Sequence, residues 1–477
     1  MNRRQFLALS TTAIGAAGLS QCARRSPMAS TAQRFVSQAG VLTADLVAQS
    51  SRLSLAGQPA TLLSYNAQVP GPLLEIAPGD TLQLRFHNAL SQPTNLHFHG
   101  LHIPPTGNAD NVFRHVPPGE TATYEFTLPI DHPAGLAWYH PHVHGVVAEQ
   151  VFGGLAAPIL VRGGLDELPE IKAAAEALLV LQDFALNRRG QIQPPSPMFQ
   201  RWGRQGELIT VNGQSQPRFR LPTGGLLRLR LLNASASRIY RLALNQHLLH
   251  LIATDGSPLA APVALEELIL APGERAEVLI QGDRQPSEYA LMNLPYDRGI
   301  MDMMGGMMGG DGMMGGRLAQ PQAIAHIEYG DRVEPQPLPQ QLLALDPLPQ
   351  PSIKREFVLD HGIDHHTGAP FLINGRAFAP ERVDTPVQLG SVEDWHIINR
   401  AGMDHPFHLH TNRFQVISRN GQPVTPLAWK DVVAIKAYEE VVIRVRFADY
   451  AGKTVYHCHI LDHEDQGMMG IIEMQSV

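Results

Sequence analysis

The chain has 477 residues, with 37 Lys and Arg against 44 Asp and Glu, and a formal net charge of -7. This length exceeds what a single hydrophobic core usually supports, so two or three domains are expected. The charged residues form no basic block, which argues against nucleic acid as a partner. Gly (42) and Pro (38) are abundant and long helical periodicity is scarce, a combination that favours an all-β chain with many turns.

The first 29 residues are interpreted as a targeting segment. Arg3 and Arg4 precede an apolar, Ala- and Gly-rich run that ends at Leu19, a pattern that resembles a twin-arginine export signal. The run is too short to span a membrane as a mature helix. We therefore expect the protein to be periplasmic, or otherwise exported by this route. Cys22 lies where a lipid-acceptor cysteine would stand, but Gln21 before it differs from the small residue expected there, so we do not favour a lipid anchor.

Runs in which apolar and polar residues alternate predict β-strands along the whole chain. The strand candidates are Leu82–His87, Asn95–His99, Thr121–Thr127, Arg355–Leu359, Asp394–Asn399, Phe414–Ser418 and Val441–Phe447. The middle of the chain repeats strand-and-turn patterns, at Leu226–Leu232, Arg241–Leu251 and Ala276–Ile280. A Pro-rich stretch between Pro335 and Pro351 is typical of a linker. We therefore expect a signal segment at 1–29 and three domains at 30–163, 164–335 and 336–477.

Four His-X-His pairs stand out among the predicted strands. They are His97 and His99, His140 and His142, His408 and His410, and His457 and His459. Residues i and i+2 of a strand share one face and lie about 7 Å apart, near enough to serve neighbouring metal ions. One such pair can be a solvated surface feature, but eight imidazoles in four pairs are hard to explain without a metal. The histidines His102, His115, His132, His144, His361, His365 and His366 are expected at the surface or behind the ligands.

Cys458 lies between two of these histidines and is the only cysteine besides Cys22. His463 and Met468 follow it at five and ten residues. A thiolate, imidazoles and a weak thioether are the ligands of a blue-copper electron-transfer centre. His405 lies an odd number of residues before His408 and His410, so on a strand it would face the opposite side from that pair. It is the expected second imidazole. The alternatives are a zinc site or a buried structural cysteine, but zinc rarely recruits methionine.

The middle segment, 164–335, contains no paired histidines and is expected to have a structural or spacing role. Near its end, the stretch Met301–Met314 holds seven of the 15 methionines. Glycine at this density argues against a packed core or a stable helix. One interpretation is a thioether surface that captures Cu(I) through Met301, Met303, Met304, Met307 and Met308. The other is a flexible low-complexity loop without a ligand.

Together these segments resemble the multicopper oxidases, the family of laccases, ascorbate oxidase, ceruloplasmin and the bacterial copper efflux oxidases. The motifs His-X-His-Gly, His-X-His, His-Pro-X-His-X-His and His-Cys-His-X₃-His-X₄-Met occur in the family's order and cover nearly the whole mature chain. The resemblance is to the bacterial three-domain type. It implies three cupredoxin-like Greek-key β-barrels and four copper ions, with a trinuclear cluster between the first and third domains.

The resemblance also implies a role for each ligand. His405, Cys458 and His463 correspond to the type 1 copper ligands, with Met468 axial. His97 and His408 correspond to the type 2 ligands, and the type 3 pair is assigned to His99, His140, His142, His410, His457 and His459. Glu464 and Asp110 resemble the acids that supply protons on the type 3 and type 2 sides. Each could instead be an ordinary turn or surface carboxylate.

The implied reaction is one-electron oxidation of a donor at the type 1 copper, coupled to reduction of O₂ to two waters. We favour Cu(I) as the donor, in copper tolerance, with phenols and diamines as further substrates of a monomeric enzyme. Met403, two before His405, matches the copper efflux oxidases, but Ala401 stands where those enzymes have an acid.

The main alternative is a laccase that acts mainly on phenols. Other classes are a copper-storage protein or chaperone, a copper nitrite reductase, and a nonenzymatic relative that acts in cell division. The complete ligand set argues against the nonenzymatic relative, and a nitrite reductase would not need four histidine pairs.

Overall fold

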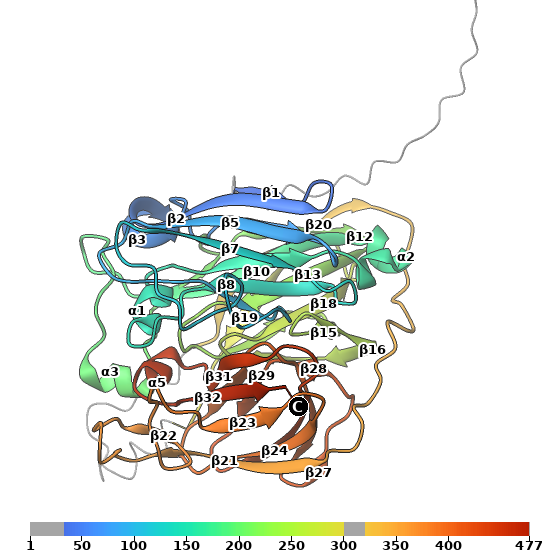
Figure 1. Ribbon diagram of the computed structural model, residues 1–477. Coiled ribbons are helices and arrows are strands. Elements are labelled where there is room, and N and C mark those ends of the chain that lie inside the picture. Colours follow the sequence, from blue (N-terminus) through green and yellow to red (C-terminus); the bar gives the residue numbers. More distant parts are fainter. Residues whose placement is uncertain (1–32, 300–319, 477) are drawn as a thin grey trace, which may run out of the picture.

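The computed structural model describes residues 33–299 and 320–476, which form six β-sheets and a few short helices (Figure 1). Each of three consecutive stretches of chain contributes two sheets. The expected all-β architecture of three cupredoxin-like Greek-key β-barrel domains is confirmed. The predicted export signal, Cys22 and Met301–Met314 lie outside the described residues.

The first domain pairs a five-stranded sheet, β1-β4-β9-β8-β6, with a four-stranded sheet, β3-β2-β5-β7. Its elements are β1 (Arg34–Val36), β2 (Val41–Leu55), β3 (Gln58–Tyr65), β4 (Leu73–Ile76), β5 (Thr81–Asn88), β6 (His97–His99), β7 (Thr121–Thr127), β8 (Gly135–His140), α1 (Val147–Phe152) and β9 (Ala157–Val161). Every second side chain of β5 is buried between the sheets, as its alternation predicts. The predicted strand Asn95–His99 is shorter than expected, because the Leu96 N–H donates to the Tyr124 hydroxyl at 3.0 Å instead of to a neighbouring strand.

The second domain pairs a six-stranded sheet, β11-β10-β13-β18-β15-β16, with a five-stranded sheet, β12-β20-β19-β14-β17. Its elements are η1 (Gly164–Glu167), α2 (Pro169–Ala173), β10 (Ala175–Phe184), α3 (Pro197–Trp202), β11 (Leu208–Val211), β12 (Arg218–Thr223), β13 (Leu226–Asn233), β14 (Tyr240–Leu244), β15 (Leu249–Thr254), β16 (Ser257–Leu265), β17 (Leu268–Leu270), β18 (Arg275–Gln281), β19 (Glu288–Leu294) and β20 (Gln322–Arg332). The strand-and-turn pattern predicted over Arg241–Leu251 corresponds to two strands, β14 and β15. A turn with Gln246 at a positive φ of 63° separates β14 from β15, which belong to different sheets.

The third domain pairs the sheet β22-β21-β24-β30-β26-β27, with β28 beside β26, and the sheet β23-β32-β31-β25-β29. Its elements are β21 (Ile353–His361), β22 (Phe371–Ile373), β23 (Thr385–Gln388), β24 (Val392–Asn399), β25 (His405–Leu409), β26 (Phe414–Arg419), β27 (Gln422–Pro423), β28 (Trp429–Lys430), β29 (Val432–Ile435), β30 (Glu440–Arg446), β31 (Gly452–Cys458), α5 (Leu461–Asp465) and β32 (Met469–Gln475). Trp395, Phe407 and Tyr456 are buried in its core.

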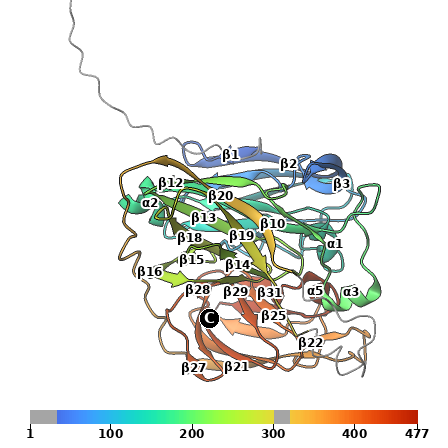
Figure 2. The ribbon, with the colours of Figure 1, turned by 180° about the vertical axis from the view of Figure 1, so that it is seen from behind.

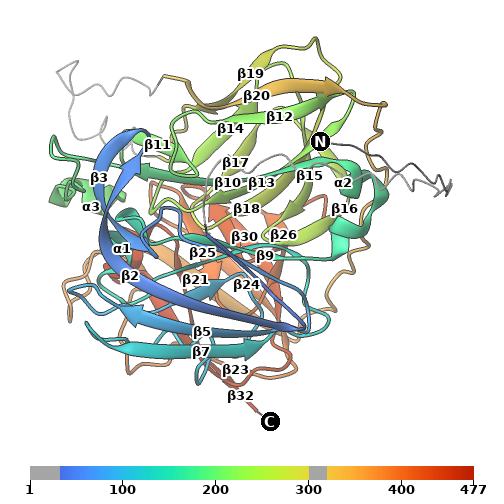
Figure 3. The ribbon, with the colours of Figure 1, turned by 90° about the horizontal axis from the view of Figure 1, so that it is seen from above.

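The three domains are arranged so that each contacts the other two. Figure 3 shows the first domain (blue) and the second (green to yellow) side by side, with the third (orange to red) behind them. From the back, β16 of the second domain lies close to β28 of the third (Figure 2), where Thr254 donates a hydrogen bond to the Trp429 carbonyl at 3.0 Å. Among the described residues, no helix is long and apolar enough to cross a membrane.

Candidate metal centre

Strand pairing brings the histidine motifs together two by two. β6 and β8 of the first domain are antiparallel, and their register sets His97 opposite His140. β25 and β31 of the third domain are also antiparallel and set His408 opposite His457. β6 holds both histidines of its pair, so His97 and His99 share a face. The second histidines of the other pairs, His142, His410 and His459, follow one or two residues after the ends of β8, β25 and β31. The two groups of imidazoles meet at the interface between the first and third domains.

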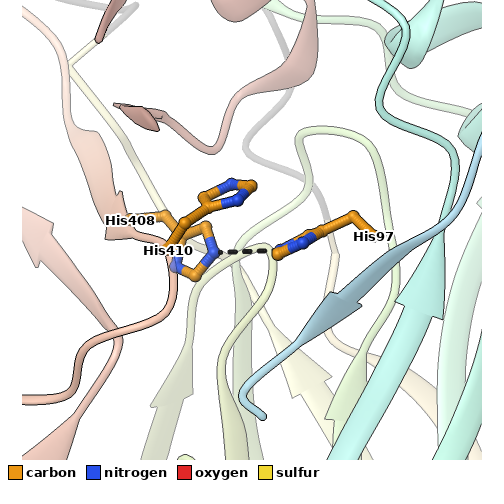
Figure 4. A group of neighbouring side chains, drawn as sticks. All are labelled: His97, His408 and His410. Atoms are coloured by element: carbon orange, nitrogen blue, oxygen red, sulfur yellow. Dashed lines mark hydrogen bonds between the residues drawn. The ribbon is translucent and has the colours of Figure 1, made fainter. Parts of the chain in front are cut away.

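The imidazoles from the two domains face one another at short range. Nε2 of His97 lies 3.4 Å from Nε2 of His408, the dashed contact in Figure 4. Nε2 of His457 lies 3.2 Å from Nε2 of His142 and 3.0 Å from Nε2 of His410. Two nitrogens that each lie about 2.0 Å from one ion at a tetrahedral angle are about 3.3 Å apart. These separations therefore suit nitrogens that share a metal ion.

A third group consists of His99, His140 and His459, whose ring centroids lie 5.1 to 5.8 Å apart. Trp138 stacks on His140 with a centroid distance of 4.1 Å. The second domain closes this group from the other side. Gly273 has a φ of +84°, and a Cβ there would lie 2.8 Å from the His459 ring. Only glycine combines that backbone conformation with so close an approach.

Cys458 points away from this cluster, into the core of the third domain. Its Sγ lies 3.3 Å from Nδ1 of His405 and 3.7 Å from Nδ1 of His463, and the two Nδ1 atoms are 3.4 Å apart. Met468 is buried in the same core. Its N–H donates to the His463 carbonyl at 2.9 Å and its own carbonyl accepts from Cys458 N–H at 3.0 Å. The structure thus brings together the four residues expected at a type 1 site.

Burial controls the protonation of these predicted ligands. The eight paired histidines, and His405 and His463 beside Cys458, are at most 3% exposed. Desolvation lowers the pKa of every one of them, to about 4 for His457 and about 3 for His140. Neutral imidazole is the form that binds a metal ion. Burial raises the pKa of the Cys458 thiol, so metal binding there releases a proton.

Two predicted acids lie directly behind the ligands. Both carboxylate oxygens of Asp110 lie within 3.0 Å of Nδ1 of His97, and burial raises the pKa of Asp110 to about 7. Glu464 is fully buried, with its oxygens 3.1 Å from Nδ1 of His457 and 3.5 Å from Nε2 of His142. Neither Glu464 oxygen makes an aligned hydrogen bond. Burial, and then the nearby Asp465, raise the Glu464 pKa well above its ordinary value.

Sequence reasoning missed Asp431, which contacts predicted ligands from two domains. Its Oδ1 accepts from Nε2 of His99 at 3.0 Å, and its main-chain carbonyl accepts from Nδ1 of His408 at 2.7 Å. Arg275 of the second domain donates to both Asp431 carboxylate oxygens at 2.6 Å. The second domain therefore supports the cluster directly, beyond the structural or spacing role predicted for it.

The buried charges continue outward from Asp431. Desolvation raises the Asp431 pKa to about 6, although Arg275 opposes the shift. Asp255 accepts from the Arg275 N–H at 2.9 Å and lies 3.0 Å from Nζ of Lys430. Lys430 also lies 3.1 Å from Glu274. No signal in the sequence distinguishes these charged residues from surface ones, because their burial depends on domain packing.

The short helix α5 carries His463 and Glu464 and is held by the other two domains. Asp465 accepts the N–H groups of Gly145, Val147 and Ala148 of the first domain. Asp462 forms an ion pair with Arg204 of the second domain, with 2.8 Å between Nη2 and Oδ1. Packing against both domains therefore fixes the positions of the two functional side chains.

Other predicted residues lie elsewhere. Met403 is fully buried in the core of the third domain, away from solvent. His365 and His366 are exposed, as expected. His361 is different, because its Nε2 lies 3.1 Å from Nε2 of His405. It therefore lies behind a ligand, one of the two positions expected for it.

The donor atoms fit a copper-binding role. Nδ1 of His99, Nε2 of His140 and both ring nitrogens of His459 are buried without a hydrogen-bond partner. Buried polar atoms normally have partners, and a metal ion would satisfy these. His99 is left with Nδ1 for this purpose because its Nε2 contacts Asp431. Two imidazoles, a thiolate and a thioether suit copper better than zinc.

Comparison with known proteins identifies the family. Models of the multicopper oxidase family match residues 47–165, 166–304 and 349–476. The multicopper oxidase mco of Staphylococcus epidermidis is 29% identical over 423 residues, which cover 86% of this chain and 83% of the relative. The cell division protein FtsP of Xenorhabdus nematophila is 31% identical over an alignment of 494 positions, which covers 98% of each protein. The structure of a multicopper oxidase from Campylobacter jejuni, described as a metallo-oxidase, matches with a TM-score of 0.81 and 30% identity over 93% of this chain and 96% of that one. The chain therefore belongs to the multicopper oxidase family.

Proposed function

We propose that this protein is an oxidase that couples one-electron oxidation of Cu(I), and of phenols or diamines, to four-electron reduction of O₂ to water. The observation that carries this proposal is the meeting of four His-X-His pairs at one domain interface, with Nε2 atoms 3.0 to 3.4 Å apart. Cys458, bonded on both sides to histidines of that interface, connects it to a second candidate site. A storage protein has no need for this connection.

We propose four copper ions. His405, Cys458, His463 and Met468 hold the type 1 ion. His97 and His408 hold the type 2 ion. The type 3 pair divides into one set of His142, His410 and His457 and another of His99, His140 and His459. When bound, the copper ions accept and release single electrons and bind O₂.

The residues between the two sites provide a route for electrons. Cys458 is covalently joined to His457 and His459, so a path of bonded atoms runs from its Sγ to both imidazoles of the other site. Two main-chain hydrogen bonds fix this peptide: Cys458 N–H donates to the Met468 carbonyl at 3.0 Å, and His459 N–H donates to the Pro406 carbonyl at 2.6 Å. Rigid positioning of this kind limits reorganisation during electron transfer.

Protons come from the two buried acids in this proposal. Glu464 holds a proton at neutral pH because burial disfavours its charge. From its position it can release that proton beside His142 and His457. Asp110 has the corresponding position beside His97. A cavity of about 730 Å³ that reaches His142, with His115, His144 and Lys453 also in its wall, is the proposed entry for O₂ and exit for water.

The choice of Cu(I) as donor is supported by the chain near His405. Gly299, the last described residue before the Met-rich segment, packs against Gly402, where a Cβ on Gly299 would overlap the Gly402 carbonyl. The buried Met403 lacks access to solvent, so Met301, Met303, Met304, Met307 and Met308 are the remaining candidates for a Cu(I) site. A role in copper tolerance, export to the periplasm and a monomeric state complete the proposal.

A second candidate function is a nonenzymatic role in cell division, which the similarity to FtsP favours. One experiment separates the two: O₂ uptake by the copper-loaded protein, measured side by side with Cu(I) and with a bulky phenol. An oxidase is blue and consumes O₂ with at least one donor, and Cys458→Ser serves as the inactive control. A colourless protein without O₂ uptake would support the nonenzymatic role. Uptake with the phenol alone would identify a laccase.

A further inference from the structure

The orientation of the two type 1 histidines defines where an electron donor can approach. His405 and His463 both turn Nδ1 toward Sγ of Cys458, which leaves Nε2 of each ring pointing away from the site. Nε2 of His463 lies 3.1 Å from the main-chain carbonyl of Arg201, at the end of α3. Nε2 of His405 lies 3.1 Å from Nε2 of His361. Both outward nitrogens are therefore in contact with the protein.

These residues are also shielded from solvent. His405, His463, Cys458 and Met468 are all 0% exposed, so a donor cannot touch any of them without displacing another group. His361, in contrast, is partly exposed. Its Nε2 contacts His405, while part of the residue's surface stays accessible to solvent.

The position of His361 is fixed by the fold. It ends β21 and pairs in register with Phe371 at the start of β22. The two rings meet edge to face, with centroids 5.0 Å apart, and Phe371 in turn stacks on His463 at 4.0 Å. The His361 ring is therefore held in place by Phe371, which also packs against the expected ligand His463. This argues against a mobile side chain that merely covers the site.

We propose that His361 is the residue through which electrons enter the type 1 site, with the donor resting against its exposed edge and the electron crossing the His361–His405 contact. The inference rests on the proposed oxidase function. The donor loses one electron and the type 1 site gains one. No bond to His361 forms or breaks, and the hydrogen on Nε2 of His405 remains in place.

The contact between His361 and His405 should also affect the reduction potential of the type 1 site. With Nδ1 of His405 directed to the metal, Nε2–H donates to Nε2 of His361. A hydrogen bond accepted from a ligand imidazole makes that ligand more basic, which favours the oxidised ion and lowers its reduction potential. Removing the acceptor should raise the potential. A higher potential increases the driving force for reduction, so a slower reduction in the same variant would indicate that the route itself has been lost.

The test uses full-length, copper-loaded protein with His361→Leu, which keeps the side-chain volume but removes both nitrogens. Anaerobic reduction of the blue band is followed with hydroquinone and with Cu(I), and the reduction potential is titrated at equilibrium. We expect reduction to slow by about tenfold or more while the potential rises. The matched control is His365→Leu, an exposed histidine in the turn that follows β21, which should leave both quantities unchanged.

Reduction of His361→Leu at the wild-type rate, or faster, with a full blue band would overturn the proposal. If this variant fails to hold copper, His361→Gln decides the question, because it keeps an acceptor beside His405 and should slow reduction with little change in potential. A wild-type protein without a blue band or O₂ uptake would instead refute the proposed oxidase function. The two failures are therefore distinguishable.

Discussion

Replacing Arg275 by Met tests whether the second domain supports the metal cluster. Arg275 is 1% exposed and forms two hydrogen bonds to Asp431, while further bonds at 3.1 Å reach the Leu136 and Gly273 carbonyls. Arg275→Met keeps much of the side-chain length but leaves the Asp431 carboxylate buried without its partner. Asp431 in turn contacts His99 and His408, so the effect should reach the ligands.

Removing one partner of a buried ion pair costs about 3–5 kcal/mol of folding free energy. Protonation of Asp431 limits this cost, because its pKa is already raised to about 6 beside Arg275 and rises further without that charge. The folded variant then holds a proton that the unfolded chain releases, so stability falls as the pH rises. The difference from wild type should therefore grow between pH 6 and pH 8, by up to about 1.4 kcal/mol per pH unit.

Urea unfolding of the copper-free protein at pH 6 and pH 8 measures this effect, because an unchanged slope converts the shift in midpoint into free energy. Arg241→Met is the control. It breaks an ion pair with Glu267 whose side chains are 40% and 35% exposed, and should cost less than about 1 kcal/mol. After copper loading, Arg275→Met should keep its blue band but bind less copper in the histidine cluster. Equal losses for the two variants, or full copper content in Arg275→Met, would refute the reasoning.

Three further predictions concern the proposed chemistry. Cys458→Ser should abolish the blue colour and turnover without a change in the circular dichroism spectrum, and retained oxidase activity would contradict the type 1 assignment. Glu464→Gln should slow steady-state O₂ uptake because it cannot supply a proton, while anaerobic bleaching of the blue band keeps its wild-type rate; equal slowing of both would remove its proton role. Deleting 301–314 should impair oxidation of Cu(I) more than that of phenols, measured as the ratio of the two O₂-uptake rates. Equal losses for both donors would exclude a specific role for this stretch in Cu(I) capture.

The sequence allowed the histidine geometry to be predicted because strand periodicity is a local property. His97 and His99 share a face because both lie in β6, and the register between strands then sets His97 opposite His140 and His408 opposite His457. The pattern over Arg241–Leu251 indicated strand and turn, but not that β14 and β15 belong to different sheets. Alternation alone does not show that the chain passes from one sheet to another.

Charged residues at domain interfaces escaped prediction for a different reason. Asp431 and Arg275 are far apart in sequence, and each resembles an ordinary surface residue until the domains pack. The contact between His361 and His405 likewise depends on β21, β22 and β25 coming together. Long-range packing, which no local pattern encodes, decides which polar side chains become buried next to the ligands.

The shared metal cluster has a consequence for folding. Its facing ligands His97 and His408 are 311 residues apart in the chain, so an ion held by both would close a loop through all three domains. Such an ion binds only when the two domains are folded and packed together, so its binding free energy adds to the stability of the native arrangement. Copper would thus act as a reversible cross-link between the first and third domains. Limited proteolysis between the domains should then be fast in the copper-free protein and slow after loading.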